Sequence, residues 1–77
     1  MELILTMNDN QQFRRRVICK VGNNVLSSRR AMLMLMQTHA SRLGLGVEGK
    51  DYRIKHRPQE LVPFYLSTKL GDTLTIE

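Results

Sequence analysis

Only one stretch of this chain combines the length, the apolar content and the end signals of a helix. Ser27 or Ser28 can cap its start, because a serine side chain accepts a hydrogen bond from a free first-turn amide. Gly44 can end it, because glycine readily takes the left-handed conformation that follows many helices. The sequence therefore predicts one main helix that runs to about Leu43.

The predicted helix is apolar on more than one side. The stripe that we expect to pack in the core contains Met32, Leu35, Met36, His39 and Leu43. Met34 falls among polar residues, and methionine is common on adaptable binding surfaces, so Met34 is the candidate for an exposed protein interface. A second copy packed across this helix would enlarge a thin core, and we therefore expect a homodimer.

The segments around the helix alternate between apolar and polar residues, which is typical of half-buried strands. Strands are expected at residues 1–7, 13–21, 50–57, 64–68 and 73–76, with turns at 8–12 and 58–63. The order β-β-α-β-(turn)-β-β predicts an α+β domain, with one small antiparallel sheet and a single main helix packed across it.

Alternation also predicts how the second strand divides its side chains between two faces. Arg14, Arg16 and Lys20 are expected to share one face. The other face is expected to hold Phe13, Arg15, Val17, Cys19 and Val21.

The chain has 77 residues, which predicts a single domain over residues 1–77. Cys19 is the only cysteine, which excludes an internal disulfide and is typical of a reducing compartment. Cys19, His39 and His56 lack metal-site spacing, so neither a metal nor another cofactor is expected. No apolar run approaches the ~18 residues that a membrane span needs. We expect a cytoplasmic protein without membrane association.

Positive charge is concentrated in the middle of the chain. Residues 14–57 contain eleven lysines and arginines and only two acids, a net charge of +9 within a total of +5. Eight of the twelve cations are arginines, whose planar guanidinium suits phosphate oxygens. This pattern is typical of proteins that bind RNA or DNA. The alternatives are a solvated surface or one that complements an acidic protein.

The basic residues fall into two strands and the start of the helix. If the second and third strands are neighbours, their basic rows merge into one face that can hold a phosphate backbone. The alternative for the second strand is an edge position, where charge prevents aggregation. The candidate nucleic-acid contacts are Arg14, Arg16, Lys20, Arg29, Arg30, Tyr52, Arg53, Lys55 and Arg57.

The arginine pair at the helix start and Tyr52 are included among these candidate contacts for separate physical reasons. Arg29 and Arg30 occupy the first helical turn, where the helix dipole disfavours cations, so an external anion is a plausible reason for them. The alternative is that one of them pairs with Glu48 or Asp51. Tyr52 is included because an aromatic ring can stack on a base. The alternative is that its ring belongs to the core.

The C-terminal residues 66–76 read Leu-Ser-Thr-Lys-Leu-Gly-Asp-Thr-Leu-Thr-Ile. This run resembles the opening strands of the carbon-storage-regulator family of RNA-binding proteins. The resemblance covers eleven of 77 residues. The run lies at the C-terminal end of this chain, whereas the family begins with it. Thr68 also stands where the family has arginine. It implies a hairpin that turns near Gly71, and we carry no binding residue across from it.

Together these features predict a small, basic, non-enzymatic protein that contacts RNA or DNA phosphates. One alternative is a protein of the phage or mobile-element type, which binds and inhibits or adapts a larger host protein with an acidic surface. Another is a toxin-like endoribonuclease, in which His56 or Tyr52 would move a proton at a ribose oxygen.

Overall fold

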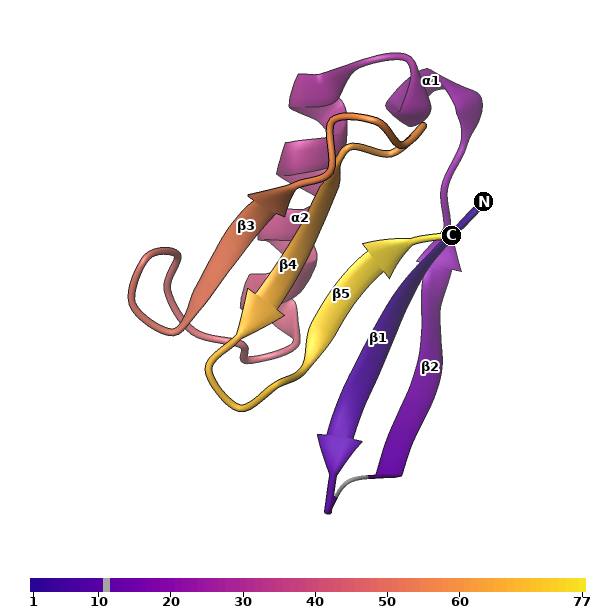
Figure 1. Cartoon of the computed structure of the whole chain (residues 1–77). Coiled ribbons are helices and arrows are strands. Elements are labelled where there is room, and N and C mark those ends of the chain that lie inside the picture. The colour runs from indigo at the N-terminus through magenta and orange to yellow at the C-terminus, as the bar shows by residue number, and fades with distance from the viewer. Residues whose placement is uncertain (11) are drawn as a thin grey trace.

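The computed structural model describes residues 1–10 and 12–77, so Gln11, in the expected turn at 8–12, lies outside the described residues. The elements are β1 (Glu2–Asp9), β2 (Gln12–Lys20), α1 (Asn23–Leu26), α2 (Arg29–Arg42), β3 (Tyr52–His56), β4 (Phe64–Thr68) and β5 (Thr73–Ile76). The strands form one antiparallel sheet in the order β2-β1-β5-β4-β3 (Figure 1). The predicted α+β fold is confirmed.

Helix α2 begins and ends where its sequence signals predict. The Ser28 side chain accepts a hydrogen bond from the Ala31 amide at 3.2 Å. The chain reverses at Gly44, whose φ is +70°, and the Leu45 amide donates to the Ala40 carbonyl at 2.9 Å. The short helix α1 is an addition to the predicted elements, which included no helix before Ser27. Neither helix described in residues 1–10 and 12–77 has the length and apolar content to cross a membrane.

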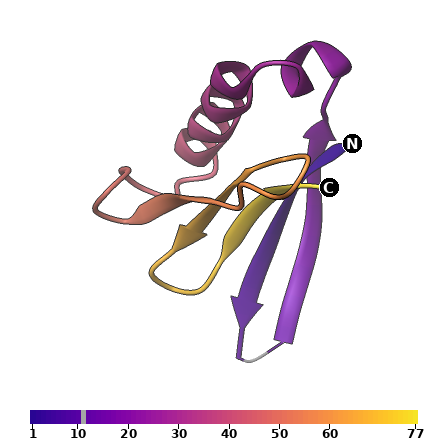
Figure 2. The ribbon, with the colours of Figure 1, turned by 45° about the horizontal axis from the view of Figure 1, so that its top comes forward.

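Both helices lie on the same side of the sheet, and α2 supplies most of the cover (Figure 2). Its buried residues Met32, Met36 and Ala40 are spaced four apart and form a narrow stripe. Leu35, His39 and Leu43, expected in the same stripe, are only half-buried. The core cluster contains Leu3, Leu5, Val21, Met32, Met36, Ala40, Tyr52, Val62, Phe64, Leu66, Leu74 and Ile76.

A β-bulge in β2 corrects the predicted division of its side chains. Leu3 pairs with Cys19, but Ile4 pairs with Val17, so Ile18 is an extra residue without a partner in β1. After the bulge, the residues of β2 therefore point to the face opposite the one that strict alternation from Arg14 predicts. Lys20, opposite Glu2, lies on the face away from Arg14 and Arg16. Phe13, Arg15 and Val17 are likewise separated from Cys19.

The strand order shows that β2 and β3 lie at opposite edges of the sheet, so the condition for one merged basic face is not met. β2 instead takes the edge position that was its alternative. β2 and β3 carry all the lysines and arginines of the five strands, and an edge position lets long charged side chains reach water. β1 instead buries Leu3, Ile4 and Leu5 in the interior of the sheet.

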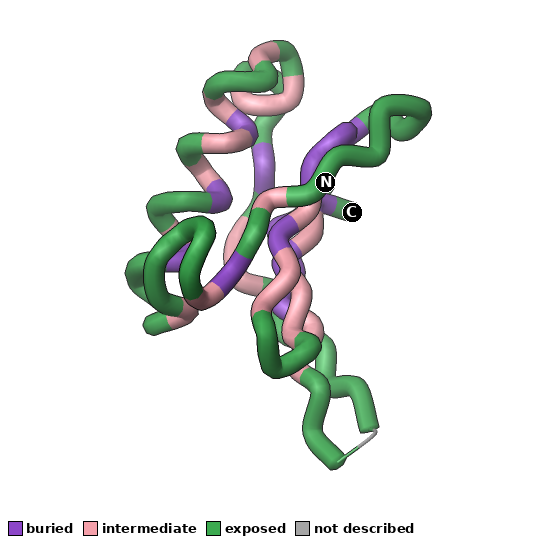
Figure 3. Tube along the Cα trace, turned by 60° about the vertical axis from the view of Figure 1, so that its left-hand side comes forward, coloured by how far each residue is buried: buried purple, intermediate pink, exposed green. Residues whose placement is uncertain are grey.

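The far end of the β1–β2 hairpin projects beyond the rest of the sheet (Figures 1 and 3). β5 pairs with β1 only from Leu3 to Thr6, so Met7–Asp9 and Gln12–Arg14 pair as strands only with each other in the described sheet. The Asn8 amide also donates to Asp72 Oδ1 of the β4–β5 turn at 2.9 Å. Figure 3 shows this arm as mostly exposed chain. Phe13 within it is 68% exposed, which is unusual for a phenylalanine.

The fully buried Leu66 provides a test of this packing. Leu66→Ala should lower the free energy of unfolding by about 2–5 kcal/mol, because it leaves a cavity between α2 and the sheet. The matched control is Leu70→Ala in the β4–β5 turn, where the side chain is 82% exposed, and it should change stability by less than about 0.5 kcal/mol. Urea unfolding followed by circular dichroism measures both, and equal effects would contradict the core described above.

Candidate nucleic-acid interface

The sheet face opposite the helices is open in the part of the chain that the structure describes (Figure 2). Residues that alternate with the core positions point to this face, because successive strand side chains point to opposite sides. They include Ile4, Thr6, Arg15, Val17, Arg53, Lys55, Tyr65, Ser67, Thr73 and Thr75. The open face is therefore rich in hydroxyl groups, with cations toward both edges.

The β3 edge of the open face carries the most regular group of cations. Arg53 pairs in register with Ser67, and Lys55 with Tyr65, so their side chains share the open face with Arg57. All three are exposed. Among the described residues, neither Arg53 nor Lys55 forms an ion pair. We call Arg53, Lys55 and Arg57 the β3 row.

Arg57 joins the β3 row to an aromatic ring. Its guanidinium lies over the ring of Tyr65, 4.0 Å from the centroid, in a cation–π contact. Its Nη1 atom is 3.6 Å from a carboxylate oxygen of Glu60. Tyr65 was not among the predicted site residues, although it lies between Phe64 and Leu66, and this alternation would have placed it opposite the core.

The other edge contributes Arg15, which was also missing from the predicted site. Its Nη2 atom donates to Glu77 Oε1 at 2.9 Å, and the Thr75 hydroxyl donates to Glu77 Oε2 at 2.7 Å. The hydrogen bond from Thr75 is the main cause that holds the pKa of the Glu77 carboxyl below its usual range. The charge of Arg15 acts in the same direction, while burial opposes both.

Tyr52, predicted to stack on a base, is 6% exposed and belongs to the core. Burial, and then the negative charge of Glu48, raise the pKa of its hydroxyl. A ring that packs beneath α2 is closed to a ligand on the open face, which agrees with the alternative that Tyr52 is a core residue. Tyr65 is the aromatic residue that the open face presents.

The remaining predicted contacts are not brought together with the β3 row. Arg14 and Arg16 point to the helix side of the projecting arm, where Arg14 Nε is 3.6 Å from an Asp9 carboxylate oxygen. Arg29 and Arg30 are exposed at the start of α2. Of the described residues, neither Glu48 nor Asp51 forms an ion pair with them.

Met34 and His56 are both accessible to a partner. Met34 is 56% exposed, as its polar neighbours in the helix predict. Met34 lines a shallow hollow of about 400 Å³, together with Val25 and Leu35. His56 is exposed and packs edge-on against Phe64, with 4.9 Å between ring centroids. Its proton-transfer role stays a prediction.

Cys19 and His39 are close in space although they are distant in sequence. The Cys19 Sγ atom lies 3.7 Å from His39 Nε2, and both residues are half-buried between β2 and α2. No group of three metal-ligating side chains occurs in residues 1–10 and 12–77. The pair therefore lacks the ligand number of a zinc site.

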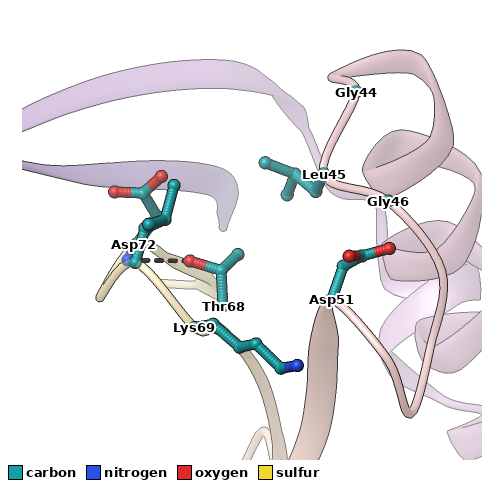
Figure 4. A pocket seen from close by; sticks show the side chains of 8 residues that line it. Gly44, Leu45, Gly46, Asp51, Thr68, Lys69 and Asp72 are labelled. Carbon is teal, nitrogen blue, oxygen red and sulfur yellow. Dashed lines mark hydrogen bonds between the residues drawn. The ribbon is translucent and has the colours of Figure 1, made fainter.

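A hollow of about 480 Å³ lies where the end of α2 meets the β4–β5 turn (Figure 4). Its polar groups hold loops together. The Asp51 carboxylate accepts from the Val47 amide at 2.8 Å, and Thr68 Oγ1 accepts from the Asp72 amide at 3.0 Å. Gly46 is required beside Asp51, since an added Cβ atom would collide with that carboxylate. We interpret this hollow as structural.

A smaller hollow of about 340 Å³ opens on the sheet face between β4 and β5. Its lining includes Arg57 and Tyr65 of the β3 side and Thr75 and Glu77 of the β5 side. The open face therefore combines an exposed basic row with a polar recess beside it. Such a surface can hold phosphates along its edge and a planar polar group in its recess.

Comparisons of the chain with protein-family models, curated proteins and solved structures find no match. The functional argument therefore depends on the geometry of the open face alone.

The Glu77 contacts predict a pH-dependent contribution to stability. Because the folded-state pKa is lowered, the ionised carboxylate stabilises the fold above the ordinary glutamate pKa of about 4.3, and this stabilisation is lost as the pH falls through the folded-state pKa. Glu77→Gln should therefore lower the free energy of unfolding at neutral pH, and its difference from the parent protein should shrink in acid.

Urea unfolding at neutral and acidic pH measures this difference. The matched control is Glu48→Gln, whose carboxylate forms no ion pair with any cation of the described chain. A Glu77→Gln effect of equal size at both pH values would show that the carboxylate's charge does not act through Arg15 and Thr75.

Proposed function

We propose that this protein is a non-enzymatic nucleic-acid-binding protein that holds phosphates along the β3 row. The observation that carries the proposal is the row itself. Arg53, Lys55 and Arg57 are exposed on one open face, and the first two have no acidic partner among the described residues. Cations grouped without compensating acids attract an anionic ligand.

The spacing of the row supports an extended strand as the ligand. Alternate residues in a β-strand are about 6.6–6.8 Å apart. This repeat is close to the separation of consecutive phosphates in an extended single strand, so each cation can face one phosphate. Arginine suits this contact because its guanidinium can bind two phosphate oxygens at once.

The other predicted cations would add phosphate contacts only if the ligand wraps around the protein. Lys20 lies on the open face at the β2 edge, opposite Glu2. The rest lie on the projecting arm or on the helix side, at Arg14, Arg16, Arg29 and Arg30. We propose the β3 row as the primary contact and these residues as a source of long-range attraction.

Salt dependence of binding tests the proposal. Affinity for a short labelled single strand, measured by fluorescence anisotropy, should fall steeply as salt rises, because bound phosphates release counterions. The double variant Arg53→Ala and Lys55→Ala should bind more weakly and reduce the log–log slope by about 1.4, since each contact contributes about 0.7 on single strands.

The matched control compares one arginine within the row with one outside it. Arg42 at the end of α2 is exposed and lines a different hollow, the one beside Met34. Arg53→Ala alone should reduce the slope by about 0.7, and Arg42→Ala should leave it nearly unchanged. A parent slope near zero, or equal losses in these two single variants, would remove the basis for a β3-row interface.

A protein-binding role is the second candidate, because Met34 is exposed beside the hollow on α2. In this case α2 would dock on a larger protein with an acidic surface, or on a second copy of the chain. Met34→Glu should then abolish capture of a nuclease-resistant partner or dissociate a homodimer in sedimentation experiments. Ser41→Glu, a change at another exposed position of α2, is the matched control.

A further inference from the structure

The sheet consists of two ladders that are joined by a short central pairing. β5 pairs with β1 along its whole length, and β4 pairs with β3 along its whole length. Between β4 and β5, only the pairs Leu66–Leu74 and Ser67–Thr73 are formed. The two strands separate beyond these pairs, which Figure 1 shows as a widening gap from their junction toward the start of β4.

Backbone groups of β5 point into this separation. In an antiparallel ladder, residue pairs that exchange hydrogen bonds alternate with pairs that do not. Glu2 and Glu77 exchange both backbone hydrogen bonds, at 2.7 and 2.8 Å, so the next pair, Leu3 and Ile76, does not. The N–H and C=O of Ile76 therefore point away from β1 and toward β4.

The same argument applies to β4. The Arg57 amide donates to the Pro63 carbonyl at 2.6 Å, so the next pair, His56 and Phe64, is the type without hydrogen bonds between its members. The N–H and C=O of Phe64 therefore point toward β5. Phe64 and Ile76 are only 7% and 5% exposed, and the described β4–β5 ladder stops before it reaches them. Buried backbone groups nearly always bind a partner, so this position favours a ligand or water.

The hollow of about 340 Å³ lies at this separation and has further polar groups in its wall. Thr6, Thr73 and Thr75 line it from β1 and β5, and Glu60 and Glu77 add carboxylates. The Arg57–Tyr65 stack provides a flat surface at its β4 side. Its volume is within the range of small-ligand sites, about 300–1,000 Å³.

We propose that this hollow receives one guanine base from a single strand whose phosphates lie along the β3 row. The inference rests on the proposed function and names its ligand more closely. Carboxylates only accept hydrogen bonds, and guanine has two adjacent donors, N1–H and the N2 amino group, to offer them. Its O6 and N7 accept hydrogen bonds from donors such as backbone amides. The other bases have fewer donors side by side.

The carboxylates remain able to accept, although each already has a partner. Glu77 receives one hydrogen bond on each oxygen, and Glu60 has one contact with Arg57. An ionised carboxylate has about four acceptor positions, so positions remain free on both. The hydrogen bonds from Arg15 and Thr75 also hold the Glu77 carboxylate in place before the base arrives, which reduces the entropy cost of binding.

The test compares labelled oligouridylates that differ only at one central base. Fluorescence anisotropy should show that central guanine binds about tenfold more tightly than central uracil, adenine or cytosine, as expected for one well-placed two-bond contact. Glu60→Gln should remove most of this preference, measured as the ratio of the two affinities. Because the change also frees Arg57 from its ion pair, affinity for plain oligouridylate should rise rather than fall. Glu48→Gln, an acid outside the hollow, should leave both properties unchanged.

Amide chemical shifts provide a second measurement that needs no substitution. The Phe64 and Ile76 amide signals should move when the guanine-containing strand is added and stay nearly fixed with plain oligouridylate. Equal affinity for all four strands, with unmoved Phe64 and Ile76 signals, would overturn the base site and leave the β3-row proposal standing. Failure of every strand to bind would overturn both proposals.

Discussion

The structure depends on the burial of one narrow helical stripe against a wider sheet. A helix of 14 residues is about 21 Å long and about 10 Å wide, so α2 can cover only part of one face of a five-stranded sheet. Met32, Met36 and Ala40 close the core over the central strands. The opposite face and the far end of the β1–β2 hairpin consequently stay in contact with solvent. The β3 row and the hollow beside it lie on the face that this limited cover leaves exposed.

Charge then determines how that exposed surface is divided. The two most basic strands occupy opposite edges, and the interior strand β5 brings threonines and Glu77 to the middle of the open face. The result is a basic row at one edge, a polar recess beside it and a second basic edge at β2. The recess follows from strand pairing. β4 and β5 each keep a full ladder with an outer neighbour but share only two residue pairs with each other.

The sequence by itself determined the elements and the chemistry of their faces. Ser28 and Gly44 bound α2 through local hydrogen bonds and a local backbone conformation, which nearby residues control. Alternation in the third strand placed Arg53, Lys55 and Arg57 on one face, because a period of two is a property of any extended chain. It also placed Tyr65 opposite the core, although only the structure drew attention to that ring.

Only the tertiary structure decided which of these elements are neighbours. β5 lies between β1 and β4, which separates β2 from β3, and this pairing joins segments more than sixty residues apart in sequence. The bulge at Ile18, which moves Lys20 to the open face, likewise depends on how β2 fits against β1. The backbone groups of Phe64 and Ile76 meet in the hollow for the same reason. Such pairings follow from the best joint burial of all strands, a global balance of free energy that no local pattern contains.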